Sequence, residues 1–338
     1  MDPSERYGLG GKLGLALGSG AARGWAHVGA LRELEVRGIR PGIVAGSSAG
    51  AIVGAFWAAD QLEELEQWGR TLDRRAVVGL LDLSLRGGLI RAQRLFDVFQ
   101  RLLGHLRIED LPRDFAAVAT DIDTGREIWI REGPLLNAVR ASVAVPGLVT
   151  PFHYQGRWLV DGGLVNAVPV SLCRAMGAHS VIAVDVNTTL VGRRTDGPRS
   201  AVRPPPPPRS TSDHEVSEDV EAVARTLGVA ERMDGWRAAL AGMLGDLRER
   251  AASGERHEPD DRPSIYEVMV CSLNVMQARI TRSRMAGDPP ELLVAPRLAD
   301  FALLDFDRVP EAIEEGRRAV TQALASAARA QPEVGPGI

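Results

Sequence analysis

The segment GIVAGSSAGAIVGAFW, residues 42–57, carries the strongest structural signal in the sequence. An apolar run at 43–45 precedes Gly46-Ser47-Ser48-Ala49-Gly50, and a longer apolar run follows it. A G-x-S-x-G sequence between a strand and a helix is typical of a nucleophile elbow. Such a turn needs positive φ near the serine, and small neighbours such as Gly46 and Gly50 let strand and helix approach closely. We therefore expect Ser48 Oγ to project above a sheet at a helix N-terminus, where developing negative charge is favoured. A Gly/Ser turn without chemistry is the alternative interpretation.

A second glycine-rich loop lies near the start of the chain. The apolar run 13–17 predicts a strand, the loop runs from Gly18 to Gly24, and a helical pattern continues to Val36 and ends before Gly38. Converging backbone N–H groups in such a loop can bind a dinucleotide pyrophosphate or an oxyanion, although the loop can also be a plain connection. A dinucleotide site is disfavoured, because the third glycine is one residue late and no acid occurs between Arg37 and Asp60.

The rest of the chain alternates strand and helix patterns, which predicts a mostly parallel α/β sheet. We expect strands at 115–120, 127–130, 157–160, 180–186 and 291–294, and helices at 135–149, 264–286 and 309–327. In the helix at 264–286, one apolar face is predicted to contain Ile265, Val268, Met269, Leu273, Met276 and Ile280. Asp161 follows the strand at 157–160 and precedes Gly162-Gly163, so it is placed either to face a cleft at the carboxyl edge of the sheet or to cap a turn.

The composition excludes some classes of partner and predicts the compartment. With 40 Lys and Arg against 44 Asp and Glu, the 338-residue chain has a formal net charge of −4 and no bulk attraction to nucleic acid or anionic lipid. Cys173 and Cys271 lie in apolar segments, which predicts two buried free thiols in a reducing compartment. The first twelve residues do not resemble a signal peptide. We therefore expect a cytoplasmic protein that does not bind nucleic acid.

The domain organisation is predicted from changes in composition along the chain. Residues 1–187 form the expected catalytic core, and residues 263–330 complete the same α/β domain. Between them, residues 188–262 contain five consecutive prolines at 204–208 and amphipathic helical patterns, typical of an insertion with a stiff linker. Residues 331–338 are expected to be a disordered tail.

Several blocks, taken in order, resemble the patatin-like phospholipases, most closely the bacterial branch related to neuropathy target esterase. The matching blocks are residues 15–24 with His27 and Gly29, the elbow 46–50, residues 142–146, Asp161-Gly162-Gly163, and the C-terminal segments 274–277 and 287–290. The resemblance covers nearly the whole chain except the insertion. It implies a three-layer α/β/α fold with a mostly parallel central sheet and a Ser/Asp dyad at the carboxyl edge of the strands.

The resemblance also implies roles for individual residues. Ser48 becomes the nucleophile and Asp161 the base, without a metal or a cofactor, and His27 braces the loop helix. The implied oxyanion hole consists of Gly20, Ala21, Ala22, Arg23 and Gly24. The glycines that support these motifs are Gly18, Gly46, Gly50, Gly162 and Gly163. The family usually has glycine at the positions of Ser19 and Ala21, and a side chain at positive φ there costs about 1 kcal/mol or more.

The implied function is a serine lipid acyl hydrolase that cleaves phospholipid or lysophospholipid esters. Its partner would be the lipid ester, with peripheral membrane contact at most. A catalytically weak lipid-binding or regulatory scaffold that keeps the same fold is the alternative. The sequence leaves the acyl length, the head group and the oligomeric state open.

Overall fold

In the computed structural model, which describes residues 3–80, 92–188, 265–302 and 305–330, eight strands form one mixed sheet. Their order is β5-β6-β3-β2-β1-β7-β8, and β4 pairs with β3 outside this path. The strands are β1 (Leu13–Leu17), β2 (Ile43–Ser47), β3 (Asp114–Asp121), β4 (Glu127–Ile130), β5 (Phe152–Tyr154), β6 (Arg157–Asp161), β7 (Ser180–Val184) and β8 (Leu292–Val294). The predicted insertion at 188–262, apart from Thr188, and the predicted tail at 331–338 lie outside the described residues.

The centre of the sheet is parallel, which confirms the predicted fold class. The pairs β3/β2, β2/β1, β1/β7 and β7/β8 are parallel, whereas β3/β4, β3/β6 and β5/β6 are antiparallel. Because β8 pairs with β7, residues before and after the gap at 189–264 share one sheet. The predicted strands are all present, and β5 is a short strand that the sequence analysis did not predict.

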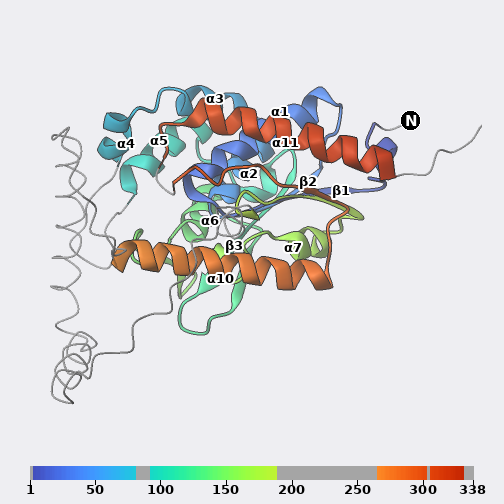
Figure 1. Cartoon of the computed structure of the whole chain (residues 1–338). Coiled ribbons are helices and arrows are strands. Elements are labelled where there is room, and N and C mark those ends of the chain that lie inside the picture. The colour runs from blue at the N-terminus through green and yellow to red at the C-terminus, as the bar shows by residue number, and fades with distance from the viewer. Residues whose placement is uncertain (1–2, 81–91, 189–264, 303–304, 331–338) are drawn as a thin grey trace, which may run out of the picture.

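Helices cover both faces of the sheet, so the molecule has three layers (Figure 1). On one side lie α1 (Trp25–Val36), α2 (Ala49–Ala58) and α11 (Val309–Ala330), and on the other lie α7 (Val170–Ala175) and α10 (Ile265–Gly287) (Figure 1). The remaining helices are α3 (Leu62–Gly69), α4 (Arg74–Leu80), α5 (Gln93–Leu103) and α6 (Leu135–Ser142). The described ranges also contain four short 3₁₀ helices, which are η1 (Glu5–Tyr7), η2 (Ala21–Gly24), η3 (Ile108–Asp110) and η4 (Gly162–Leu164).

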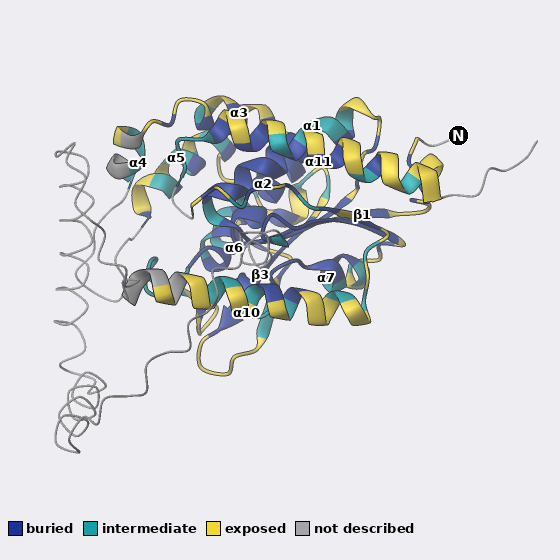
Figure 2. Ribbon diagram, in the orientation of Figure 1, coloured by how far each residue is buried: buried dark blue, intermediate teal, exposed yellow. Residues whose placement is uncertain are grey.

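The central strands are apolar throughout because side chains on both of their faces are buried. Along β1, Leu15 and Leu17 join the core under α1, α2 and α11, whereas Ala16 joins the core on the α7 side. On β2, Val44 and Ala45 divide in the same way. Figure 2 shows α2 almost entirely buried, while α10 and α11 expose their outer faces. The uncharged segment at 42–57 is thus a buried strand, turn and helix.

The register of β3 brings β2 and β6 together end to end. Val118 of β3 pairs with Ser47 of β2, and the next residue, Ala119, pairs with Asp161 of β6. β4 pairs with residues 117–120 of β3, overlapping both registers, so it occupies the opposite edge of β3. β2 and β6 therefore share one edge. Since they run in opposite directions, the carboxyl ends of both strands meet beside the middle of β3.

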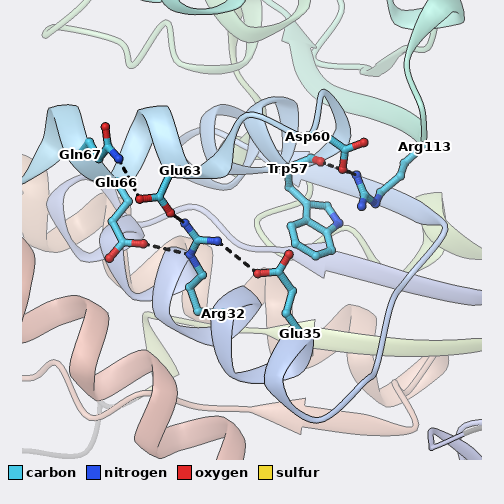
Figure 3. Close-up of polar contacts among 8 residues, drawn as sticks. All are labelled: Arg32, Glu35, Trp57, Asp60, Glu63, Glu66, Gln67 and Arg113. Carbon is cyan, nitrogen blue, oxygen red and sulfur yellow. Dashed lines mark hydrogen bonds and ion pairs between the residues drawn. The ribbon is translucent and has the colours of Figure 1, made fainter.

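Ion pairs and hydrogen bonds fix α2 and α3 to their neighbours (Figure 3). Arg32 of α1 donates from Nε to Glu66 of α3 (2.9 Å) and also pairs with Glu35 and Glu63. At the end of α2, the Trp57 carbonyl accepts a hydrogen bond from Arg113 Nη1 (2.8 Å), whose guanidinium lies over the indole ring. Arg113 is therefore a second donor, beside the Asp60 N–H (3.1 Å), to a carbonyl in the last turn of the helix that begins after Ser48.

Three expectations about local structure are wrong. The helix expected at 135–149 ends at Ser142, because Pro146 cannot donate to the helix and disfavours helical backbone before it. On α10, Val268 and Met276 expose 48% and 50% of their surface rather than facing the core. Cys173 is buried as expected and its pKa is raised by burial to about 12, but Cys271, on the outer face of α10, is exposed.

Candidate active site

Ser48 occupies the sharp turn between β2 and α2. Its φ of 53° and ψ of −119° are unfavourable for a residue with a side chain, and the packed strand and helix hold it there. The Ser48 N–H donates to Ser142 Oγ (2.9 Å), and the Ser48 carbonyl accepts from the N–H groups of Ala51 (2.9 Å) and Ile52 (3.2 Å). With 7% of its surface exposed, Ser48 is largely shielded from bulk water.

Asp161 ends β6 and caps η4. Its Oδ1 accepts the Gly163 N–H (2.8 Å), its backbone N–H donates to the Ala144 carbonyl (2.9 Å), and its own carbonyl accepts from Thr120 Oγ1 (2.8 Å). The structure thus confirms that Asp161 caps a turn, and it also places the residue at the strand ends near the Ser48 side chain. Only 2% of its surface is exposed.

The environment of Asp161 favours its neutral form. Burial raises the pKa of Asp161 to about 6, while hydrogen bonding from the Ser48 side chain and from the Gly163 N–H acts in the opposite direction. Asp161 Oδ2 is buried, and no described residue gives it a hydrogen bond of normal geometry. The Ser48 hydroxyl is therefore near the carboxylate but not tightly bonded to it, as is common for reactive pairs without a ligand. The carboxylate is ionised at neutral pH and retains an unused acceptor.

The glycine-rich loop lies against the elbow. A Cβ on Gly24 would come within 2.5 Å of Ala49 Cβ, so the loop contacts the residue that follows Ser48. The Arg23 N–H donates to the Gly20 carbonyl (3.1 Å) and is already used within the loop. Among the described residues, no acceptor is found for the N–H groups of Gly20, Ala21 and Ala22.

Ala21 and Ser19, which stand where glycine was expected in this loop, differ in backbone conformation. Ala21 has a φ of 47°, so its backbone is held in a left-handed conformation that is strained for a residue with a side chain. Ser19 is not at positive φ, and its hydroxyl donates to Gln277 Oε1 of α10 (3.2 Å). Only Ala21 therefore carries the conformational cost expected from the sequence.

Arg23 anchors the loop from within the protein. Its guanidinium donates from Nε to Asn187 Oδ1 (3.1 Å), from Nη1 to the Phe301 carbonyl (3.3 Å) and from Nη2 to Asn274 Oδ1 (3.5 Å). Asn187 also donates to the Ser19 carbonyl (2.9 Å). Burial lowers the pKa of Arg23 to about 10, so the group stays charged at neutral pH. Arg23 acts here as a structural tie between the loop, the end of β7 and α10.

His27 contacts the loop rather than Ser48. Its Nε2 lies 2.8 Å from the Gly18 carbonyl, which can only accept, so Nε2 carries the proton. Nδ1 has no described partner, and burial lowers the pKa of His27 to about 4. A neutral His27 at the base of the loop fits the expected bracing role.

Close approaches of backbone account for four of the five supporting glycines, and side chains surround the fifth, Gly163. A Cβ built on Gly18 would lie 3.0 Å from the Val184 carbonyl oxygen. A Cβ on Gly46 would lie 2.5 Å from Ala51 Cα, and one on Gly50 would lie 2.1 Å from the Leu17 carbonyl oxygen. On the Asp161 side, a Cβ would meet Val118 O at 2.2 Å from Gly162, and Gln277 Nε2 at 2.6 Å from Gly163. At Gly46, Gly50 and Gly162 the facing atoms are backbone, so a side chain would force the elements apart.

Sequence reasoning gave no individual role to three residues that hold this arrangement. Ser142 and Gln277 lay within blocks used for the resemblance, but their partners are distant in sequence. Asn187 had a weak signal, since it closely follows a buried strand whose carboxyl end lies at the same sheet edge. Among the described residues, no group of His, Cys, Asp or Glu is arranged to hold a metal ion, and no helix is long and apolar enough to cross a membrane.

Comparisons with known proteins identify the family of the chain. A family model described as patatin-like phospholipase matches residues 15–174. An uncharacterized NTE family protein of Mycobacterium tuberculosis is 34% identical over 336 residues, covering 93% of this chain and 91% of the relative. Patatin-like phospholipase domain-containing protein 6 of Mus musculus is 32% identical over 191 residues, covering 53% of this chain and 14% of that protein. The match to the solved structure of VipD from Legionella pneumophila covers 93% of this chain and 66% of that chain, with a TM-score of 0.41 and 12% sequence identity.

Proposed function

Because the chain belongs to the NTE branch of the patatin-like phospholipases, we propose that it is a serine lipid acyl hydrolase with Ser48 as nucleophile and Asp161 as base. The observation that carries the proposal is the meeting of β2 and β6 beside β3, which puts the strained Ser48 next to a buried carboxylate with a free acceptor. The ends of two strands hold a pair more rigidly than loops do.

In the proposed reaction, Ser48 Oγ attacks the carbonyl carbon of the ester while its proton passes to Asp161. The N–H groups of Gly20, Ala21 and Ala22 would hold the oxyanion, usually the largest electrostatic contribution in acyl transfer. Collapse of the tetrahedral intermediate breaks the ester bond, and the departing alcohol takes the proton from Asp161. Water then attacks the acyl-enzyme, again giving its proton to Asp161, and release of the fatty acid returns that proton to Ser48.

The proposed substrates are phospholipid or lysophospholipid esters, as the name of the family model suggests.

Peripheral contact with a lipid surface belongs to the same proposal. Trp129 and Trp158 expose 42% and 50% of their surface, and Ile122 beside Trp158 exposes 52%. Indole rings are favoured at membrane interfaces. We expect the double variant Trp129→Ala/Trp158→Ala to co-sediment less with phospholipid vesicles while hydrolysing a water-soluble ester at the parent rate. Equal co-sedimentation would remove these residues from the proposal.

The test is release of p-nitrophenol from a short and a long acyl ester, followed by release of fatty acid from lysophosphatidylcholine. Ser48→Ala and Asp161→Asn should each lower kcat by at least about 10³-fold, because the two groups act in one step. Ser180→Ala is the control, since it also removes a buried serine hydroxyl, here one that donates to the Gly10 carbonyl, but at the opposite end of the sheet. Full activity of Ser48→Ala would reject the assignment. A parent protein that binds lipid without hydrolysing esters would favour the scaffold alternative.

A further inference from the structure

One short segment contacts both members of the Ser48/Asp161 pair. Ser142 Oγ accepts the Ser48 N–H (2.9 Å), and two residues later the Ala144 carbonyl accepts the Asp161 N–H (2.9 Å). Ser142 and Ala144 are both completely buried. The segment 142–144 is thus a second physical link between the two residues, separate from the pairing of β2 and β6 with β3.

The segment has a firm support. It begins at the last residue of α6, which packs against β3 and β6, and Leu135, Ala138 and Ala141 of this helix are at most 1% exposed. The helix ends at Ser142, so the chain turns there across the strand ends. Ala144 contributes only its backbone, whereas the contact to Ser48 depends on a side chain that can be changed.

The hydroxyl of Ser142 meets a specific need of the elbow. At the N-terminus of a helix the first N–H groups have no helical acceptor, and a buried N–H without a partner is costly. Ser48 is also held at positive φ, from which an unsupported residue relaxes. Without the Ser142 hydroxyl, the Ser48 N–H would lose its hydrogen bond. Ser48 could then rotate away from Asp161 more easily.

We propose that Ser142 is a positioning residue, whose hydroxyl fixes the backbone of Ser48 so that its Oγ faces Asp161. This inference rests on the proposed function of the pair. Ser142 takes no proton from the substrate and binds no part of it. Its contribution is to the step in which Ser48 attacks, so it changes kcat and not substrate binding.

The experiment compares Ser142→Ala with Ser180→Ala in the full chain, using p-nitrophenyl ester turnover and the rate of Ser48 labelling by a fluorophosphonate. Concentrations of active sites come from the labelling endpoint. We expect Ser142→Ala to lower kcat about 10- to 100-fold, since misplacement by about 1 Å has effects of this size. KM should stay within about twofold of the parent, and the labelling rate should fall with kcat. The thermal midpoint should fall, because the buried Ser48 N–H loses its acceptor, so kcat is measured well below the midpoint of each variant.

A double-mutant cycle separates positioning from a general structural role. If Ser142 acts by placing Ser48 against Asp161, then Ser142→Ala should cost much less in the Asp161→Asn background, because the contact is already lost. Full additivity would overturn the inference, as would a kcat per active site equal to that of Ser180→Ala. A raised KM with unchanged kcat would also overturn it. If the parent neither turns over esters nor is labelled at Ser48, the proposed function itself fails and the positioning role with it.

Discussion

Two residues at the centre of the site are held in states that they would not adopt in an unfolded chain. Ser48 has positive φ without being glycine, and burial raises the pKa of Asp161 to about 6. Both conditions cost folding free energy and both serve the proposed chemistry. The strained turn presents the hydroxyl, and the raised pKa makes the carboxylate a better proton acceptor.

Asp161→Asn should lower kcat by at least about 10³-fold and stabilise the fold. A carboxyl whose pKa is raised in the folded state stabilises the protein most below its unfolded pKa, and that stability is lost as the pH rises through about 6. At pH 8 the parent therefore bears the cost of a buried charge, roughly 2–3 kcal/mol. Thermal unfolding at pH 4.5 and pH 8 measures this difference. The advantage of the variant should be larger at pH 8, and an equal advantage at both pH values would contradict the burial argument.

The pH dependence of turnover should identify Asp161 rather than His27 as the titrating base. We expect kcat/KM to fall as the pH drops below about 6, where Asp161 becomes protonated. The pKa of His27 is lowered by burial to about 4, so it cannot produce that limb of the profile. His27→Gln keeps a donor toward the Gly18 carbonyl and should leave the limb in place. Disappearance of the limb in His27→Gln would assign the base to histidine.

At the scale of single elements, the site depends on how closely the elbow approaches β1. A Cβ on Gly50, in the first turn of α2, would come within 2.1 Å of the Leu17 carbonyl oxygen, which belongs to rigid backbone. Gly42, just before β2, has open space around the same position. The two glycines therefore make a matched pair for substitution.

Gly50→Ala should destabilise the protein by about 3 kcal/mol, because the added methyl group forces β1 and α2 apart. Gly42→Ala should leave the free energy of unfolding within about 0.5 kcal/mol of the parent. Urea denaturation of the two variants gives both values. A stable Gly50→Ala protein would mean that the elbow can move away from β1, and the rigid geometry described for Ser48 would then be wrong.

The elements show which parts of the structure can be predicted from sequence. Short apolar strands such as β1 and β7, and the turn at Ser48, follow from local patterns and glycine placement. The end of α6 at Ser142 was not predicted from the helical pattern, although Pro146, four residues later, limits the helix. The outer face of α10 could not be predicted, because Val268 and Met276 look like core residues on a helical wheel. Contacts such as Arg23 with Asn187 and Asn274 join distant parts of the chain, and no local pattern encodes them.

At the scale of the whole molecule, the two ends of the described chain are joined by the crossing of α1 and α11. A Cβ on Gly29 of α1 would come within 1.7 Å of the Ile313 carbonyl oxygen, and one on Gly316 of α11 within 2.0 Å of the Ala26 carbonyl oxygen. The helices thus touch through backbone, which small residues alone permit. This contact covers Leu31 and Leu34 and closes the core on that side of the sheet.

Gly29→Ala should lower the stability of the whole protein, although alanine is the better helix former by about 1 kcal/mol. We expect a net loss of about 3 kcal/mol as the two helices separate. Gly287→Ala, at the open end of α10, is the control and should be neutral or slightly stabilising. Calorimetry of both variants should show one transition in each case. An unchanged midpoint for Gly29→Ala would mean that the crossing adapts at no cost.

One strand, β3, aligns the ends of both β2 and β6. Because Ser47 and Asp161 pair with neighbouring residues of the same strand, any sliding of β3 along its length would carry the proposed nucleophile and base together. Helices without a contact to Ser48 or Asp161 can therefore vary without changing the spacing of the pair. Heating should therefore inactivate the protein only when the sheet itself melts, and altered loops could change the choice of lipid without rebuilding the chemistry.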